Sequence, residues 1–260
     1  MLVKRSHTRR VLRGAWTPPG SPTPIQIYLK RYKIRTPLKA LIALVVPPKG
    51  PREFQRLAAA RARGIPCPRP LLWAVMRRGG LPAFSCLAVE SLGEDVEPLR
   101  SFLEQCGAGG RAERLEAAAR FLRAAHDRGF YHDDCSAEHI VVNSRLWRER
   151  RAAGSNGAGD GPDALRSGLF AFLDVDNARL GRAAVGDADR LKNIAQVWRS
   201  FGRKSALNAS DWTRFWSAYW GTLDPPRNAA LIRGLNRIAL RKTGRPMFNP
   251  DAPASIREGD

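Results

Sequence analysis

Alternating apolar and polar positions predict a β-strand over residues 25–32. Its three aliphatic residues share one face at a period of two, and Lys30 lies among the polar residues of the other face. After a proline-rich break, residues 52–63 carry apolar side chains at helical spacing, which predicts a helix with Glu53 in its first turn. A strand that carries a lysine is therefore followed by a helix that carries a glutamate.

Further strands and then a series of helices follow along the chain. Two apolar runs flank an Arg-Arg-Gly-Gly sequence that is typical of a hairpin, at residues 71–76 and 83–89. Beyond residue 93 the helical spacing predominates, in segments 112–128, 189–201, 210–222 and 228–242. The pattern predicts an α+β protein with a small β-rich N-lobe over residues 25–92 and a mainly helical C-lobe over residues 93–247.

Three segments do not fit these periodic patterns. Residues 1–24 are basic and rich in proline, which leaves two interpretations open, a flexible basic arm or an incomplete first hairpin. Residues 144–168 are rich in Arg, Ala and Gly and lie between two short apolar runs, so we expect a mobile insertion on a hairpin. Residues 248–260 are expected to form a loose tail.

Composition limits the classes of function. A chain of 260 residues with 43% hydrophobic content can bury a core. No apolar run approaches the roughly 20 residues that span a bilayer, and the N-terminus lacks the apolar segment of a secretory signal. A cytoplasmic location is therefore expected. The four cysteines form no CxxC pair, which argues against zinc-ribbon and thioredoxin-like sites.

The charge balance predicts an anionic partner. The chain has 44 Lys and Arg against 24 Asp and Glu, a formal net charge of +20. Nucleic acid, an acidic membrane surface and a phosphorylated ligand would all be attracted, and a solvated basic surface without a partner is an equal alternative. No zinc-finger or RNP-like spacing is present, so we expect no specific binding of nucleic acid.

Acidic and imidazole side chains gather near the ends of two predicted strands. Asp134 and His139 lie in a polar loop before the apolar run 140–142, and Asp174 ends a second apolar run. Two such strands would bring these side chains to one edge of the C-lobe, where they could hold a metal and a reacting hydroxyl. Phosphoryl transfer also needs a cation on the phosphates, which Lys30, paired with Glu53, could supply.

The order of these residues resembles the protein-kinase-like superfamily, and more closely the Kdo/WaaP-type lipopolysaccharide core kinases. In that family the catalytic loop carries His where protein kinases carry Asn, as at His139, and the later segment resembles Leu-Asp-Val-Asp-Asn-Ala-Arg at 173–179. The resemblance runs from about residue 25 to residue 201. It implies a two-lobed protein-kinase-like fold.

The resemblance also implies roles for five residues. Lys30 would contact the α- and β-phosphates of ATP with Glu53 as its orienting partner, Asp134 would be the catalytic base, and His139 and Asp174 would bind Mg²⁺ or Mn²⁺. For His139 one alternative stays open, that it only donates a hydrogen bond to a nearby backbone carbonyl.

Several positions depart from the family pattern. Asp133 places a second carboxylate beside the proposed base, and Asn193 stands where an Asp generally supports the catalytic loop. No Gly-rich phosphate loop precedes Lys30, and no Walker-type motif is present. His126 and His132 are expected to be structural, and Cys135, which lies beside acids, is assigned no nucleophilic role.

The leading hypothesis is an ATP-dependent phosphotransferase that phosphorylates a hydroxyl on a sugar of a lipopolysaccharide-type glycolipid. It would work at the inner face of the cytoplasmic membrane, as a peripheral protein drawn to anionic lipids. A protein serine/threonine kinase and a catalytically silent kinase-like binding module are the alternatives. The sequence leaves the identity of the acceptor and the oligomeric state open.

Overall fold

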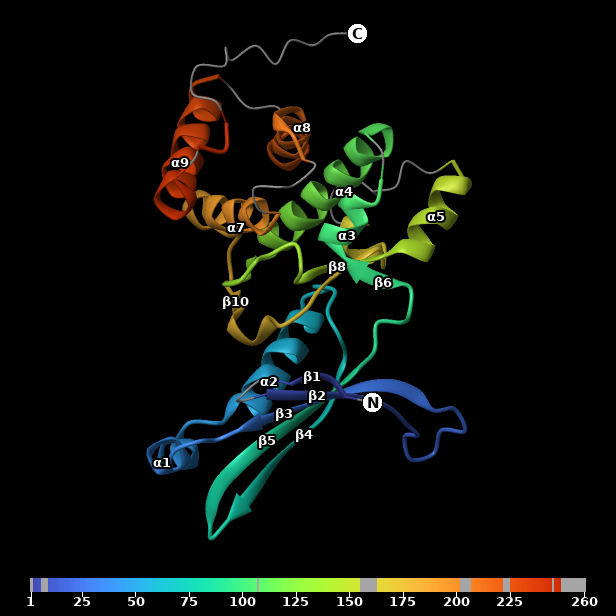
Figure 1. Ribbon diagram of the computed structural model, residues 1–260, viewed down its shortest axis with the longest axis vertical. Coiled ribbons are helices and arrows are strands. Elements are labelled where there is room, and N and C mark those ends of the chain that lie inside the picture. Colours follow the sequence, from blue (N-terminus) through green and yellow to red (C-terminus); the bar gives the residue numbers. More distant parts are fainter. Residues whose placement is uncertain are drawn as a thin grey trace. The chain divides into compact units, whose positions relative to one another are not determined.

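The computed structural model describes residues 2–5, 9–106, 108–154, 163–201, 207–221, 225–244 and 246–248. The chain divides into two compact units, one built around a sheet and one mainly helical (Figure 1). The first unit comprises Met1–Asp95 and the returning segment Ala171–Ala178, and the second comprises Val96–Phe170 and Arg179–Asp260. The predicted order of a small antiparallel-sheet region before a helical region is confirmed.

A five-stranded antiparallel sheet forms the first unit, in the order β1-β2-β3-β5-β4. Residues 2–5 and 9–16, where the sequence left an arm or a hairpin open, form the first two strands of this sheet and pair with one another. Strand β2 pairs with β3 along its whole length, which places Arg9 opposite Tyr32. The strands are β1 (Leu2–Arg5), β2 (Arg9–Trp16), β3 (Ile25–Lys33), β4 (Pro70–Arg78) and β5 (Leu81–Glu90).

The face of β3 that carries its polar side chains is the buried face. Lys30 and Tyr32 are 8% and 6% exposed, whereas the aliphatic residues of the opposite face are only half-buried. Helix α2 (Lys49–Ala62) packs on β3, β4 and β5 and covers this face. Its first turn approaches β5 so closely that a Cβ atom at Gly50 would lie 2.7 Å from the carbonyl oxygen of Cys86. A residue larger than glycine there would push the helix away from the sheet.

Two further elements complete the first unit. Helix α1 (Pro37–Val45) connects β3 to α2 and forms from the longest apolar run of the sequence. The 3-10 helix η1 (Val175–Asn177) belongs to the returning segment and packs against α2.

Helices make up most of the second unit. In Figure 1, α4 is green and α7 to α9 are orange to red; α4 packs against α8, and α7 packs against α9. The helices are α3 (Leu99–Glu104), α4 (Ala108–Asp127), α5 (Ser144–Ala152), α6 (Asp163–Arg166), α7 (Asp187–Ser200), α8 (Ala209–Trp220) and α9 (Pro225–Thr243). Short strands join them: β6 (Val96–Pro98), β7 (Phe130–Tyr131), β8 (Ile140–Asn143), β9 (Phe170–Phe172) and β10 (Arg179–Leu180).

The segment expected to be a mobile insertion differs from that expectation in its first part. Residues 144–152 form α5, and Trp147 of this helix is 1% exposed and packs edge-on against Phe102, with 5.2 Å between ring centroids. A buried tryptophan on a run of arginines anchors a helix that composition alone did not indicate. Residues 155–162 lie outside the described residues, as do residues 249–260 of the expected tail.

The aromatic residues of α8 form core contacts, and one of them binds a buried histidine. His126 of α4 is fully buried, accepts a hydrogen bond from the Tyr219 hydroxyl, and donates through Nε2 to Oδ1 of Asn193 at 3.0 Å in the matching tautomer. Burial lowers the pKa of His126 to about 4. The folded protein therefore holds this imidazole neutral at neutral pH.

This burial predicts a pH-dependent loss of stability. The folded-state pKa lies below the ordinary value of 6.5, so the unfolded chain takes up the proton first, and stability falls as the pH drops below about 6.5. Between pH 7.5 and pH 5.5, a range above most carboxyl pKa values, His126 should contribute a loss of about 1 kcal/mol in the free energy of unfolding. Urea unfolding at the two pH values measures it. His126→Gln keeps a donor and an acceptor and should show a smaller loss; an equal loss would contradict the assignment.

Candidate active site

A buried ion pair lies at the centre of the first unit. Nζ of Lys30 is 2.6 Å from Oε1 of Glu53, and the glutamate is 1% exposed. The Tyr32 hydroxyl donates a short hydrogen bond to the other carboxylate oxygen, Oε2. Both oxygens of Glu53 thus have partners, which a buried carboxylate requires.

Local sequence explains why these side chains meet. Lys30 and Tyr32 are two residues apart on β3, so they point to the same face of the sheet. Glu53 is in the second turn of α2, as the helix begins at Lys49. The close approach at Gly50, whose amide donates to the Ser85 hydroxyl at 3.1 Å, sets the first turn of this helix against the sheet.

Asp174 of the returning segment joins this pair. Its Oδ1 is 2.9 Å from Nζ of Lys30, and both of its oxygens accept from the Arg9 guanidinium at 2.9 and 3.0 Å. The residue adopts a left-handed backbone conformation with φ of 51°, directly before η1. Non-glycine residues are uncommon in this region of backbone space, and those that adopt it cluster at functional sites. The conformation of Asp174 is therefore consistent with a functional role.

The charges of this cluster keep its carboxylate ionised. Burial alone would raise the pKa of Asp174, but the ammonium of Lys30 and the guanidinium of Arg9 hold it well below its usual range. Burial likewise acts to lower the pKa of Lys30, and the carboxylates Glu53 and Asp174 reverse that effect and raise it. The site therefore offers a charged ammonium and a charged carboxylate side by side.

The second unit carries the predicted catalytic loop between β7 and β8. The Asp134 side chain is 66% exposed, and its backbone carbonyl accepts from Nδ1 of His139 at 2.9 Å. The Asp133 carboxylate instead lies 3.5 Å from Nε of Arg179. The Asp134 carboxylate lies 3.4 Å from Nδ1 of His139, and it is the more exposed of the two neighbouring acids, since the Asp133 side chain is 46% exposed.

Two amide side chains of α7 support this loop. Asn193, which is fully buried, accepts from the backbone amide of His132 and donates to its carbonyl oxygen at 2.8 Å and to Oε1 of Gln196 at 2.9 Å. Gln196 donates to the carbonyl of Asp133 and accepts from the amide of Cys135 at 3.2 Å. An amide both donates and accepts, so Asn193 binds both backbone groups of His132, which an aspartate could not do.

The predicted metal ligands belong to different units. Asp174 belongs to the first unit and His139 to the second. Within the stretches of chain that the structure describes, no three His, Cys, Asp or Glu side chains gather around one point. The donor types themselves suit a divalent ion, an ionised carboxylate in one unit and an imidazole whose Nδ1 proton is held by a carbonyl in the other.

Sequence reasoning missed three residues that contact the predicted ones. Tyr32 could have been found, because the period of two that places Lys30 on the polar face of the strand places Tyr32 on that face too. Gln196 is one helical turn from Asn193, so helical spacing could also have indicated it. Arg9 reaches Asp174 only through the pairing of β2 with β3, which no local pattern in the sequence reveals.

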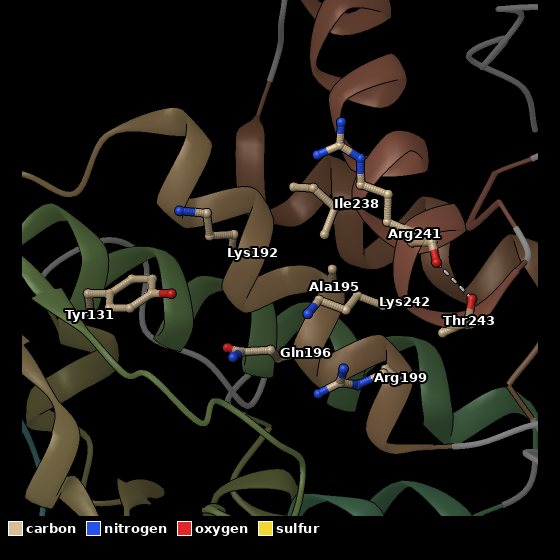
Figure 2. A pocket seen from close by; sticks show the side chains of 10 residues that line it. Tyr131, Lys192, Ala195, Gln196, Arg199, Ile238, Arg241, Lys242 and Thr243 are labelled. Carbon is tan, nitrogen blue, oxygen red and sulfur yellow. Dashed lines mark hydrogen bonds between the residues drawn. The ribbon is translucent and has the colours of Figure 1, made fainter.

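A basic crevice of about 390 Å³ lies beside the loop in the second unit (Figure 2). It is bounded by α7, α9 and Tyr131 of β7, and Gln196 links its wall to the loop. Lys192 pairs with Asp189 at 2.7 Å, while no acid of the described chain pairs with the other three cations. The lining residues are Tyr131, Lys192, Ala195, Gln196, Arg199, Ile238, Ala239, Arg241, Lys242 and Thr243.

Comparisons with known proteins place this arrangement in a family. The solved structure of WaaP in complex with acyl carrier protein is similar to this chain, with a TM-score of 0.56 at 17% sequence identity, over 92% of this chain and 87% of that chain. This likeness confirms the predicted kinase-like fold. No curated protein sequence matches the chain. The sequence model of the lipopolysaccharide kinase (Kdo/WaaP) family matches residues 3–219. The chain therefore belongs to this family, whose members are kinases that phosphorylate sugars of the lipopolysaccharide core.

Proposed function

We propose that this kinase transfers the γ-phosphoryl group of ATP to a hydroxyl on a sugar of a lipopolysaccharide-type glycolipid. The observation that carries the proposal is the cluster of Lys30, Glu53 and Asp174, a buried ammonium fixed between two carboxylates. Phosphoryl transfer depends on positioning and charge neutralisation more than on covalent chemistry by the protein. A preorganised cation beside an ionised carboxylate supplies both.

Lys30 is the proposed contact for the α- and β-phosphates. Its charge is maintained by Glu53 and Asp174, and its position is fixed by a hydrogen bond to a carboxylate that is itself held by Tyr32. Glu53 is accordingly a positioning residue for the ammonium.

Asp134 is the proposed catalytic base. The acceptor hydroxyl would lose its proton to this carboxylate while its oxygen forms a bond to the γ-phosphorus and the bond to the β–γ bridging oxygen breaks, releasing ADP. The exposure of Asp134 and the ion pair of Asp133 with Arg179 support this choice between the two acids.

Asp174 and His139 are the proposed metal ligands. A bound Mg²⁺ or Mn²⁺ would neutralise charge on the transferring phosphate. Asp174 contributes an ionised oxygen donor whose present partners are Arg9 and Lys30. His139 donates through Nδ1 to the carbonyl of Asp134, so Nε2 would be its metal-binding nitrogen.

The charge distribution supports an anionic acceptor at a membrane. The crevice beside the loop contributes four cationic side chains and no acid among its lining residues, which suits an acceptor with phosphate or carboxylate groups. A net charge of +20 favours the anionic cytoplasmic face of the inner membrane, at about 1 kcal/mol for each well-placed basic residue. We therefore place the enzyme there as a peripheral protein. None of the described helices is both long and apolar enough for a membrane span.

Radiolabelled ATP offered together with membrane glycolipid extracts, free sugars and generic protein substrates tests the proposal. Label is expected in the glycolipid fraction. Label in the protein fraction alone would contradict it and support a protein serine/threonine kinase.

Asp174→Asn and Lys30→Met should each abolish phosphate transfer. The first removes an ionised ligand and the second removes the cation on the phosphates, each a loss of several kcal/mol of transition-state stabilisation. Steady-state transfer assays measure turnover, and thermal unfolding measures stability. Lys30→Met should also lower stability, since it leaves the buried Glu53 without its cation.

Matched substitutions nearby control for general effects. Asp176→Asn alters a second ion-paired aspartate of the same segment, and Arg31→Met removes an exposed cation of the same strand. Both controls should retain most of the activity. If Asp176→Asn were inactive and Asp174→Asn were active, the metal ligand would be Asp176 and not Asp174.

Asp134→Asn should lower kcat by about 10²- to 10⁴-fold and leave ATP affinity nearly unchanged, because a base acts in the transition state. Asp133→Asn should have a milder effect, since Arg179 holds that carboxylate in an ion pair. Turnover assays and nucleotide-binding titrations on both variants measure the two effects. The opposite ranking of kcat would move the base to Asp133.

His139 should give the enzyme a preference for Mn²⁺ over Mg²⁺, because Mn²⁺ accepts imidazole better than Mg²⁺ does. His139→Asn should shift the ratio of the two activities toward Mg²⁺ while some turnover remains. A titration of each metal with both proteins measures the ratios. Identical ratios would show that His139 only binds the carbonyl of Asp134.

A further inference from the structure

Helix α1 exposes its apolar side chains to solvent. Of its nine residues only Ala40 is buried. Soluble proteins seldom expose so many large apolar residues together, and such patches mark interaction sites. The exposed fractions are 67% for Leu38, 53% for Leu41, 51% for Ile42, 48% for Leu44, 87% for Val45 and 47% for the adjoining Val46.

Local signals, more than packing, define this helix. Thr36 caps its N-terminus by accepting a hydrogen bond from the amide of Lys39, and Pro37 takes its first position. The helix ends at Val45, shortly before a pair of prolines. It lies at one end of the first unit (Figure 1) and packs against β5. A helix formed in this way presents its apolar surface outward without disturbing the core.

The sequence before and within the helix is basic and contains no acidic residue. The first 52 residues of the chain contain twelve Lys and Arg and no Asp or Glu. Lys33 and Arg35 immediately precede the helix, Lys39 lies within it, and all three are exposed. An apolar surface flanked only by cations is complementary to an anionic bilayer, where acyl chains lie next to phosphate groups.

A second copy of the chain fits this surface less well. Pairing two α1 helices would bring two sets of uncompensated cations together, and such like-charge contacts are unfavourable. A full membrane span is also excluded for this helix, because nine residues extend about 14 Å and the hydrocarbon core is about 30 Å thick. The remaining arrangement is a helix that lies in the interface.

We propose that α1 inserts its apolar side chains into the interfacial layer of an anionic bilayer, with Lys33, Arg35 and Lys39 on the lipid phosphates. The inference rests on the membrane association in the proposed function, and it identifies α1 as the element that contacts the lipid. Charge alone would hold the protein above the headgroups, whereas an inserted helix fixes the first unit to the lipid surface.

Vesicle binding of the full chain tests the inference. Vesicles of phosphatidylcholine with and without phosphatidylglycerol are floated with wild-type protein and with the double variant Leu41→Ser/Leu44→Ser. The variant should bind anionic vesicles at least about tenfold more weakly, since two leucines no longer enter the lipid. Leu240→Ser is the matched control, because Leu240 of α9 is 48% exposed, as is Leu44. It should bind like wild type.

Hydrogen exchange distinguishes insertion from surface attraction. Amides of residues 38–46 should exchange more slowly when anionic vesicles are present. Undiminished binding by the double variant, or unchanged exchange in this segment, would overturn the inference in favour of attraction by charge alone. Self-association that the double variant abolishes, without vesicle binding by wild type, would overturn it in favour of a second copy.

Transfer assays separate this inference from the proposed function. On a soluble, delipidated core oligosaccharide the double variant should match wild type, and on glycolipid in anionic vesicles it should be slower. Equal rates on vesicle-borne glycolipid would overturn a working role for insertion. Absence of transfer to any glycolipid by wild type would contradict the proposed function, while the vesicle-binding result would still decide the insertion of α1.

Discussion

The burial of Glu53 is the constraint on which the first unit depends. A carboxylate at 1% exposure is costly unless both of its oxygens are bound, and here Lys30 and Tyr32 bind them. Lys30 and Tyr32 lie on one face of β3. Because Glu53 of α2 must reach both of them, α2 covers that face of the strand. The glycine at position 50 lets the helix come close enough for the contact. The same lysine then meets Asp174, and one electrostatic requirement thereby determines both the packing and the geometry of the candidate site.

In the second unit, the buried polar groups that support the catalytic loop are paired by uncharged side chains. Its catalytic loop is held by Asn193 and Gln196, and the buried His126 bonded to Asn193 is kept neutral by its surroundings. Uncharged amides hold backbone groups without adding a buried charge. Asp134, the proposed base, therefore lies in a loop whose supporting amides carry no charge.

Much of the fold was predictable because local patterns carry it. Period-two alternation located β3, helical spacing located α2 and the aromatic core face of α8, and the order of Lys30, Glu53, Asp134, His139 and Asp174 indicated the family, which is confirmed. The pairing of Arg9 with Asp174 was not predictable, since it depends on contacts between residues 165 positions apart. Helix α5 was missed because one buried tryptophan, Trp147, outweighs a composition typical of linkers. The roles of the five site residues stay predictions.

The amide at position 193 has a consequence for how this sequence can vary. Its side-chain nitrogen donates to two oxygens, the carbonyl of His132 and Oε1 of Gln196. An aspartate at this position, introduced by substitution or by deamidation, would lose both of these hydrogen bonds. Its carboxylate oxygen would instead lie against two oxygen acceptors and be repelled by them. The change becomes tolerable only if residue 196 supplies a donor in return and the loop backbone finds another partner. Positions 193 and 196 are therefore coupled, and divergence within the family should exchange them as a pair.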